Sequence, residues 1–236
     1  GTETNAKKQS GPNNTNLTLL PRSSLEMQIA LGSRPTKGFV YVQGQITTIS
    51  VDLSDYGSNN FVGKRIDGYS ASRAILTEKA TDALNKVQQD LEKQGLGLKI
   101  FDAYRPKRAV RHFYRWSKDH GDTRFKQTYY PKIAKRELFR EGYIARRSSH
   151  TRGSTVDLTV IELKTGKELD MGSIFDLFGP VSWYKSGQVT PKQKASRKLL
   201  RTTMMKHGFK PYWMEWWHFT LRNEPFPRTY FDFEVR

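Results

Sequence analysis

Apolar residues along the chain follow two periods, one typical of strands and one typical of helices. Residues 155–161 (TVDLTVI) alternate and are rich in β-branched side chains, which predicts a strand with Asp157 and Thr159 on one face. Residues 97–101 and 216–221 are also predicted to be strands. Apolar residues at helical spacing predict a helix that ends near Gly95, and these residues are Ala80, Ala83, Leu84, Val87 and Leu91.

Two further helices are predicted from a proline close to their first turn. One begins at Pro106 and continues to about residue 117. The other begins at Thr190-Pro191 and ends at Gly208, and its predicted buried face contains Ala195, Leu199 and Thr203. We therefore expect an α+β fold, in which helices pack against a small, mostly antiparallel sheet.

Composition divides the 236 residues into three parts. Residues 1–16 are polar and lack an apolar face, which predicts a disordered tail. Residues 17–54 contain short apolar runs, and we expect an N-terminal extension that packs on the main domain. Residues 55–236 contain the remaining elements and form that domain, since a chain of this length buries one substantial core.

The net charge of +17 at pH 7 is concentrated in residues 105–152, which contain 15 Lys and Arg against 4 Asp and Glu. Such a basic stretch can indicate nucleic-acid binding. The chain contains no zinc knuckle, no ribonucleoprotein aromatic motif and no Gly-Lys-rich arm. We therefore expect no nucleic-acid partner and favour a solvated basic surface that works near an anionic polymer such as a cell envelope.

The absence of cysteine excludes disulfides and thiolate metal sites, so any zinc must be bound by histidine and carboxylate. No apolar run approaches the roughly 18 residues of a membrane span, and we expect a soluble protein without one. The first residue is glycine rather than an initiator methionine. We expect an exported, periplasmic protein that has lost its signal peptide, with a cytoplasmic location as the alternative.

Two segments carry the residue types of a catalytic zinc site. Residues 148–157 (SSHTRGSTVD) contain His150 and Asp157, and residues 215–218 (EWWH) contain Glu215 and His218. Two imidazoles and one carboxylate can hold a zinc ion, and a second carboxylate is left to act as a base. The remaining histidines lack a second ligand at suitable spacing and are predicted to be structural, and they are His112, His120 and His207.

The spacing of these residues requires two irregularities in the backbone. On one straight strand His150 and Asp157 would lie about 23 Å apart on opposite faces, so the chain must reverse between them. Gly153 permits that turn. Glu215 and His218 would point to opposite faces of a regular strand, so a shared site predicts a bend or bulge at Glu215.

Three other residues have ordinary explanations from the sequence alone. Arg105 follows a predicted strand, at a junction where a charge is commonly solvated. Tyr69, in a loop rich in glycine and aromatic residues, is typical of a core tyrosine. Asp176 is typical of a loop aspartate whose carboxylate accepts hydrogen bonds from nearby backbone amides.

At these residues the chain resembles the VanX-type D-alanyl-D-alanine dipeptidases, zinc enzymes related to D,D-carboxypeptidases and peptidoglycan L,D-endopeptidases. The patterns S-x-H-x-x-G-x-x-x-D and E-x-W-H are specific in combination. The resemblance covers the chain from about residue 55 to its end. The shared stretches are NFVGKRIDGY, FDAYRPKRAV, YYPKI, GYIARRSSHTRGSTVDLT, DMGSIFD, EWWHF and YFDFEV.

The resemblance assigns roles to eight residues. It implies one catalytic zinc ion per chain with three ligands, which are His150, Asp157 and His218. It implies that Glu215 is the general base and acid and that Arg105 stabilises the developing oxyanion. Three substrate-binding residues are also implied: Asp176 and Tyr69 at the amino end of the substrate, and Ser148 in the pocket near the metal.

The expected function is therefore zinc-dependent hydrolysis of D-Ala-D-Ala to D-alanine, in peptidoglycan precursor metabolism or recycling, by a zinc dipeptidase domain of residues 55–236. The expected partner is a small dipeptide substrate. A D,D-carboxypeptidase that acts on longer muropeptides is the alternative among enzymes. A basic, non-catalytic cell-wall-binding module is the alternative from another class, but such a module needs neither Glu215 nor Arg105.

Overall fold

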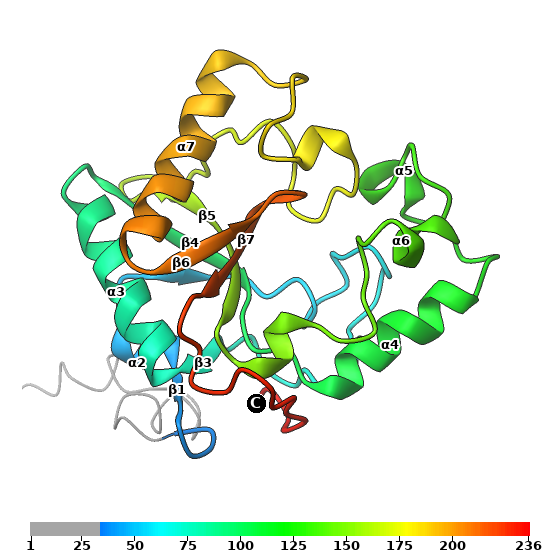
Figure 1. Ribbon diagram of the computed structural model, residues 1–236, viewed down its shortest axis with the longest axis horizontal. Helices are drawn as coiled ribbons and strands as arrows, with labels where there is room; N and C mark the ends of the chain where they lie inside the picture. The colour runs from blue at the N-terminus through cyan, green and yellow to red at the C-terminus, as the bar shows by residue number, and fades with distance from the viewer. Residues whose placement is uncertain (1–33) are drawn as a thin grey trace, which may run out of the picture.

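The computed structural model describes residues 34–236 and is built on a five-stranded sheet (Figure 1). The strand order is β2 (Ser50–Val51), β4 (Leu96–Asp102), β5 (Thr155–Glu162), β7 (Glu215–Leu221) and β6 (Phe209–Tyr212). The predicted α+β class is confirmed with one correction. The sheet is mixed rather than mostly antiparallel, because β2 pairs in parallel with β4 while the other neighbours are antiparallel.

Helices flank this sheet. In the view of Figure 1, α3 (Glu78–Glu92) and α7 (Pro191–Lys206) lie on one side, and α4 (Lys107–Lys118), α5 (Lys126–Tyr129) and α6 (Glu137–Arg140) lie on the other. In the described part of the chain, 3-10 turns occupy Ser149–Arg152 and Pro180–Ser182. A separate antiparallel pair joins β1 (Phe39–Tyr41) to β3 (Ile75–Thr77), and α2 (Val42–Gln45) follows β1.

The helix predicted from residues 80–91 is α3. The side chain of Thr77 begins it by accepting a hydrogen bond from the amide of Ala80 at 3.4 Å. The buried positions of α3 include Ala80, Leu84, Val87 and Leu91, as the apolar spacing predicts. This buried face packs against β4, the strand that leads to Arg105.

The predicted buried face of α7 is wrong in part. Ala195 is exposed, whereas Arg197 is buried together with Leu200, Thr203 and Met204. The physical reason is a set of backbone acceptors: the Arg197 guanidinium donates hydrogen bonds of 2.6, 2.9 and 2.7 Å to the carbonyls of residues 171, 183 and 181. A buried arginine therefore ties α7 to the loop that carries Asp176.

The chain reversal predicted before β5 lies at Gly153, whose φ is +93°. A Cβ atom at this position would also come within 2.3 Å of the Phe39 ring. Glycine is thus required both by the backbone conformation and by the packing of β1 against the turn. The turn places the end of the 3-10 segment 149–152 directly before β5.

Phe39 also shows how residues 34–54 pack on the rest of the protein. Its ring contacts the rings of Tyr104, Phe226, Phe231 and Phe233, with centroids 5.0–5.8 Å apart. The predicted tail of residues 1–16, and residues 17–33 of the predicted extension, lie outside the described residues. Among the residues from 34 to 236, no helix has the length and apolar character needed to cross a membrane.

Candidate active site

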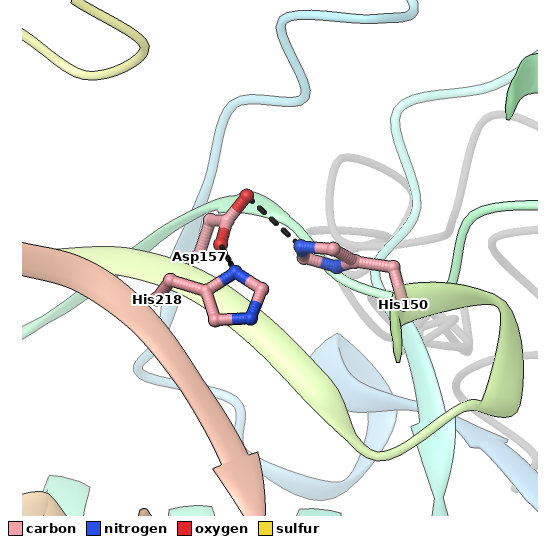
Figure 2. Close-up of side chains that lie close together, drawn as sticks. All are labelled: His150, Asp157 and His218. Atoms are coloured by element: carbon pink, nitrogen blue, oxygen red, sulfur yellow. Dashed lines mark hydrogen bonds and ion pairs between the residues drawn. The ribbon is translucent and has the colours of Figure 1, made fainter. Parts of the chain in front are cut away.

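His150, Asp157 and His218 lie together where β5 pairs with β7 (Figure 2). His150 Nε2 is 3.1 Å from Asp157 Oδ2, and His218 Nδ1 is 3.0 Å from Asp157 Oδ1. One ligand atom from each residue lies within 4.8 Å of the others, which allows the three to hold one metal ion. Within the described residues, this is the one group of three or more metal-ligating side chains so placed.

Strand pairing and the Gly153 turn bring these three residues together. Asp157 on β5 is directly opposite His218 on β7, and opposite residues of neighbouring strands have adjacent side chains. His150 reaches the same place from the 3-10 segment that precedes the turn. The cluster therefore depends on the sheet register and on one glycine.

The hydrogen bonds of the cluster prepare the imidazoles to bind a metal. His150 Nδ1 donates to the carbonyl of Ala103 at 2.7 Å, which leaves Nε2 free to act as a ligand atom. His218 presents Nδ1 to the cluster instead. Burial alone would raise the pKa of Asp157, but its contacts with His150 and His218 hold that pKa well below the ordinary value. Asp157 is thus an ionised carboxylate beside two imidazole nitrogens, a donor set that suits zinc.

Glu215 lies beside this cluster because β7 is irregular at its start. Pro211 of β6 is paired with Phe219, but the next residue, Tyr212, is paired with Glu215. The predicted irregularity at Glu215 is therefore present, and Glu215 Oε1 lies 3.6 Å from His218 Nδ1. Burial raises the pKa of Glu215 to about 7, although His218 acts in the opposite direction. A carboxyl group with this pKa can both take up and release a proton near neutral pH.

Arg105 lies beside this cluster, with Nη2 4.0 Å from Asp157 Oδ2, and two further carboxylates hold it. Its Nη2 atom lies 2.7 Å from Asp102 Oδ2, and its Nε atom lies 3.8 Å from Asp55 Oδ2. Nη1 donates to Ser148 Oγ at 3.2 Å. Burial alone would lower the pKa of Arg105, but Asp102 and Asp55 raise it, so the guanidinium stays charged.

Asp55 and Asp102 are functional candidates that the sequence reasoning missed. Both are buried, and burial followed by the charge of Asp102 raises the pKa of Asp55 well above its ordinary value. Asp102 precedes Arg105 by three residues in FDAYRP, a spacing that could have pointed to it. Asp55 has no comparable sequence feature, because it reaches Arg105 only through the fold.

Tyr69 is placed behind Arg105 rather than along the pocket wall. It is buried, and its hydroxyl donates to Asp102 Oδ1 at 2.8 Å. Tyr69 is absent from the described residues that line the pocket, and its predicted contact with substrate stays a prediction. Ser148 does line the pocket, where its hydroxyl also accepts a hydrogen bond from the amide of His150 at 3.2 Å.

Asp176 lines the pocket in an unusual backbone conformation. Its φ is +63°, the one positive φ at a non-glycine position among residues 34–236. Such strain persists where the surrounding structure imposes it, often at functional sites. Within the described residues its carboxylate accepts no hydrogen bond from a backbone amide, unlike a loop-bracing aspartate. Burial, followed by the charges of Asp157, Asp55 and Glu215, raises its pKa well above the ordinary value.

The pocket has a volume of about 300 Å³. It brings together seven of the eight predicted site residues: Arg105, Ser148, His150, Asp157, Asp176, Glu215 and His218. Its apolar wall contains Phe61, Phe113 and Phe178. A space of this size accepts a small molecule such as a dipeptide.

The other histidines make contacts away from the pocket. His112 is buried, and its Nδ1 accepts a hydrogen bond from the amide of Asp67 at 2.9 Å. His207 follows α7, with Nε2 2.7 Å from Asp90 Oδ2. His120 is an exposed residue of the turn after α4. None of the three belongs to the metal-ligating group found in the described part of the chain.

A group that could hold a metal ion, with a buried carboxylate beside it in one pocket, is the arrangement expected of a metallopeptidase. The sequence model of peptidase family M15, described as D-ala-D-ala dipeptidase, matches residues 35–236. The chain belongs to this family, which confirms the resemblance inferred from the motifs. The match includes residues 35–54 as well as the predicted catalytic domain.

Relatives from several bacteria carry the same family description. A D-alanyl-D-alanine dipeptidase of Streptomyces coelicolor is 43% identical over 200 residues, which are 85% of this chain and 99% of the relative. One from Enterococcus faecium is 38% identical, over 84% of this chain and 98% of the relative. One from Escherichia coli K12 is 31% identical, over 73% of this chain and 79% of the relative.

Two solved structures show only a low overall likeness. The LdcB LD-carboxypeptidase covers 64% of this chain and 61% of its own, with 18% identity and a TM-score of 0.37. The zinc complex of a mutant vancomycin-resistance D,D-pentapeptidase VanY covers 67% of this chain and 78% of its own, with 13% identity and a TM-score of 0.37.

Proposed function

We propose that this protein hydrolyses D-Ala-D-Ala to two molecules of D-alanine in a zinc-dependent reaction. Its relatives at 38–43% identity are D-alanyl-D-alanine dipeptidases that match over nearly their whole length. The observation that carries the proposal is the position of Glu215 beside the His150, Asp157 and His218 cluster in one pocket. A metal-binding module without catalysis would not need this buried carboxylate.

The donor set fits a catalytic zinc ion. Two imidazole nitrogens and one carboxylate supply three ligands, which is the number that leaves a position for water or substrate. When bound, zinc polarises the peptide carbonyl as a Lewis acid and lowers the pKa of water. Ala103 and the β5–β7 pairing would hold the two imidazoles in place for it.

Glu215 moves the proton in this proposal. Its carboxylate accepts a proton from water in the pocket and then donates that proton to the amine of the departing D-alanine. A pKa of about 7, raised by burial, suits both steps near neutral pH. General acid–base assistance of this kind contributes roughly 10²–10⁴-fold to the rate.

Arg105 supplies a fixed positive charge where the carbonyl oxygen becomes negative. Asp102, Asp55 and Ser148 hold its guanidinium, so little reorganisation is needed during the reaction. We assign Tyr69 a positioning role in this arrangement, since its hydroxyl holds Asp102. Its effect on the reaction would then be transmitted through Arg105.

Asp176 favours a dipeptidase over a carboxypeptidase. When the bond before the C-terminal residue is cleaved, a free amino group lies next to that bond only in a dipeptide, where its ammonium can pair with a carboxylate. Asp176 lines the pocket, and burial, followed by the charges of Asp157, Asp55 and Glu215, raises its pKa. An ammonium would relieve this repulsion, which supports recognition of the amino end by Asp176.

Two substrates and a chelator test the proposal. The zinc-loaded protein is expected to release D-alanine from D-Ala-D-Ala, to lose this activity with a chelator and to recover it with zinc. N-acetyl-D-Ala-D-Ala is expected to be a poor substrate, because it has no ammonium. Equal cleavage of both substrates would favour the carboxypeptidase, and cleavage of neither would exclude a peptidase of this specificity.

The basic surface supports a proposal about location. With a net charge of +17, the protein is suited to work beside an anionic cell envelope after export. Fractionation of the native organism would test this, since recovery only in the cytoplasm would contradict export. Release from the envelope fraction by salt would support the electrostatic association.

A further inference from the structure

Arg147 lies where two cavities of the structure adjoin. It lines the catalytic pocket of about 300 Å³ and also a neighbouring cavity of about 290 Å³. Ser148 is shared by the same two cavities. Arg147 is exposed, and its guanidinium lies over Tyr230, a residue of the neighbouring cavity.

The charges along the catalytic pocket leave Arg147 available. The described cations that line it are Arg105 and Arg147. Arg105 is already bound to Asp102 and Asp55. Among residues 34–236, by contrast, no carboxylate lies within ion-pair distance of Arg147, whose guanidinium lies over the ring of Tyr230 at 5.1 Å from the centroid. This aromatic contact restricts the side chain without neutralising it.

The neighbouring cavity adds positive charge on the same side. Lys107, Arg111 and Arg146 line it with Arg147, and none of its described lining residues is acidic. Asp232, at 3.6 Å from Arg111, offsets part of this charge. Clustered charges of one sign raise the local concentration of ions of the opposite sign. An anionic group is therefore favoured at this end of the catalytic pocket.

A dipeptide is a zwitterion, and the pocket contains a counterpart for each of its charged ends. The carboxylate of Asp176 suits the ammonium group. We infer that Arg147 binds the terminal carboxylate of the dipeptide and thereby selects substrates with a free carboxyl end; this inference rests on the proposed function. A planar guanidinium can donate two parallel hydrogen bonds to a carboxylate, which fixes its orientation as well as its position.

Comparison of an acid with its amide isolates this contact. D-Ala-D-Ala and D-alanyl-D-alaninamide have the same scissile bond and the same amino end, but the amide has no terminal charge. Hydrolysis of both by the zinc-loaded protein is followed with wild type, Arg147→Gln and Arg147→Lys. Arg140→Gln is the matched control, because Arg140 is exposed, pairs with Glu137 at 3.5 Å and does not line the pocket.

For Arg147→Gln, KM for the acid should rise roughly tenfold or more, the order expected when a hydrogen-bonded charge is lost. The kcat value should change less than about threefold, and KM for the amide should stay close to that of the wild type. Arg147→Lys should bind the acid more tightly than Arg147→Gln does, because lysine keeps the positive charge but lacks the two parallel N–H donors of a guanidinium. An equal change for acid and amide, or none for either, would overturn the inference.

Measuring substrate binding without turnover tests this inference independently of the proposed catalysis. Calorimetry with zinc-loaded Glu215→Gln measures the dissociation constants of acid and amide without turnover. The acid should bind at least about tenfold more tightly, and Arg147→Gln in this background should remove most of the difference. This result would support the carboxylate contact even if the wild type hydrolysed neither compound. Equal binding of acid and amide, or binding of neither, would refute it.

Discussion

Tyr212 of β6 is paired with Glu215 of β7, and not with His218, the residue that a regular register would place opposite it. Trp216 and Trp217, which separate Glu215 from His218 in the sequence, are buried. This irregularity allows two residues at a spacing of three to line the same pocket, although a regular strand would separate them. The position of the proposed base therefore depends on a local departure from strand geometry.

Glu215→Ala tests this arrangement directly. Turnover of D-Ala-D-Ala should fall by roughly 10²-fold or more, because general acid–base assistance is usually of that order. Zinc content, measured by atomic absorption, should stay near one ion per chain, since the proposed ligands are His150, Asp157 and His218. Loss of zinc in proportion to activity would show instead that Glu215 is a ligand or supports the ligands.

The sequence was most informative where local rules apply. Apolar spacing predicted α3, and the spacing of His150 and Asp157 required the turn at Gly153. The same reasoning required an irregularity at Glu215, which the β6–β7 register contains. In each case the backbone conformation follows from residues close together in the chain.

Contacts between distant residues were not predictable in this way. Asp55 approaches Arg105 across fifty residues of chain, and no periodic pattern identifies such a pair. Arg197 is buried because three carbonyls of another loop accept its hydrogen bonds, which overrides the apolar face expected for α7. The parallel pairing of β2 with β4 likewise depends on how the chain crosses the fold.

Replacement of Arg197 should therefore destabilise the protein. Arg197→Met keeps much of the side-chain volume but leaves one buried and two partly buried carbonyls without their donor. We expect a loss of roughly 2–4 kcal/mol in the free energy of unfolding, since each unsatisfied buried acceptor costs about 1–3 kcal/mol and removal of a buried charge offsets part of the sum. Urea unfolding of the wild type and of Arg197→Met measures this loss in the free energy of unfolding.

Lys198→Met is the matched control, because Lys198 is the exposed neighbour on the same helix. Its stability should stay within about 0.5 kcal/mol of the wild type, as is usual for surface substitutions. If Arg197→Met unfolded at the same urea concentration as this control, the three carbonyls must be satisfied by water, and the proposed tie between α7 and the loop would be wrong.

His112 predicts a pH dependence of stability. Burial lowers its pKa below the ordinary value of 6.5, although Asp67 acts in the opposite direction, with smaller lowering effects from Arg115 and Lys64. The unfolded chain thus binds a proton at pH values where the folded protein does not. This residue should reduce stability as pH falls through 6.5 towards the lower pKa of the folded state, with no such effect well above 6.5.

Urea unfolding at pH 7.5 and 5.5 measures this contribution. His112→Gln, which cannot be protonated, should lose less stability between the two pH values than the wild type does. His120→Gln is the control, since His120 is exposed, and it should retain the pH dependence of the wild type. Identical pH dependence in all three proteins would show that His112 contributes nothing to it.

The last prediction concerns Asp176, where sequence alone favoured a loop-bracing role. Asp176→Asn removes the charge but nearly keeps the size, and the described structure shows no backbone amide bonded to this carboxylate. Fold and zinc content should therefore be retained. The value of kcat/KM for D-Ala-D-Ala should fall by roughly 30-fold or more, because loss of one partner of a desolvated charge pair costs about 2–5 kcal/mol.

An amino-blocked substrate distinguishes the two roles of Asp176. N-acetyl-D-Ala-D-Ala carries no ammonium, so its slow hydrolysis should change little when Asp176 is replaced by Asn. A purely structural role would instead reduce hydrolysis of both substrates equally, since a displaced loop at residues 171–183 would disturb the pocket for either one. The ratio of the two kcat/KM values therefore reports on the ammonium contact itself, independently of how much total activity the variant retains.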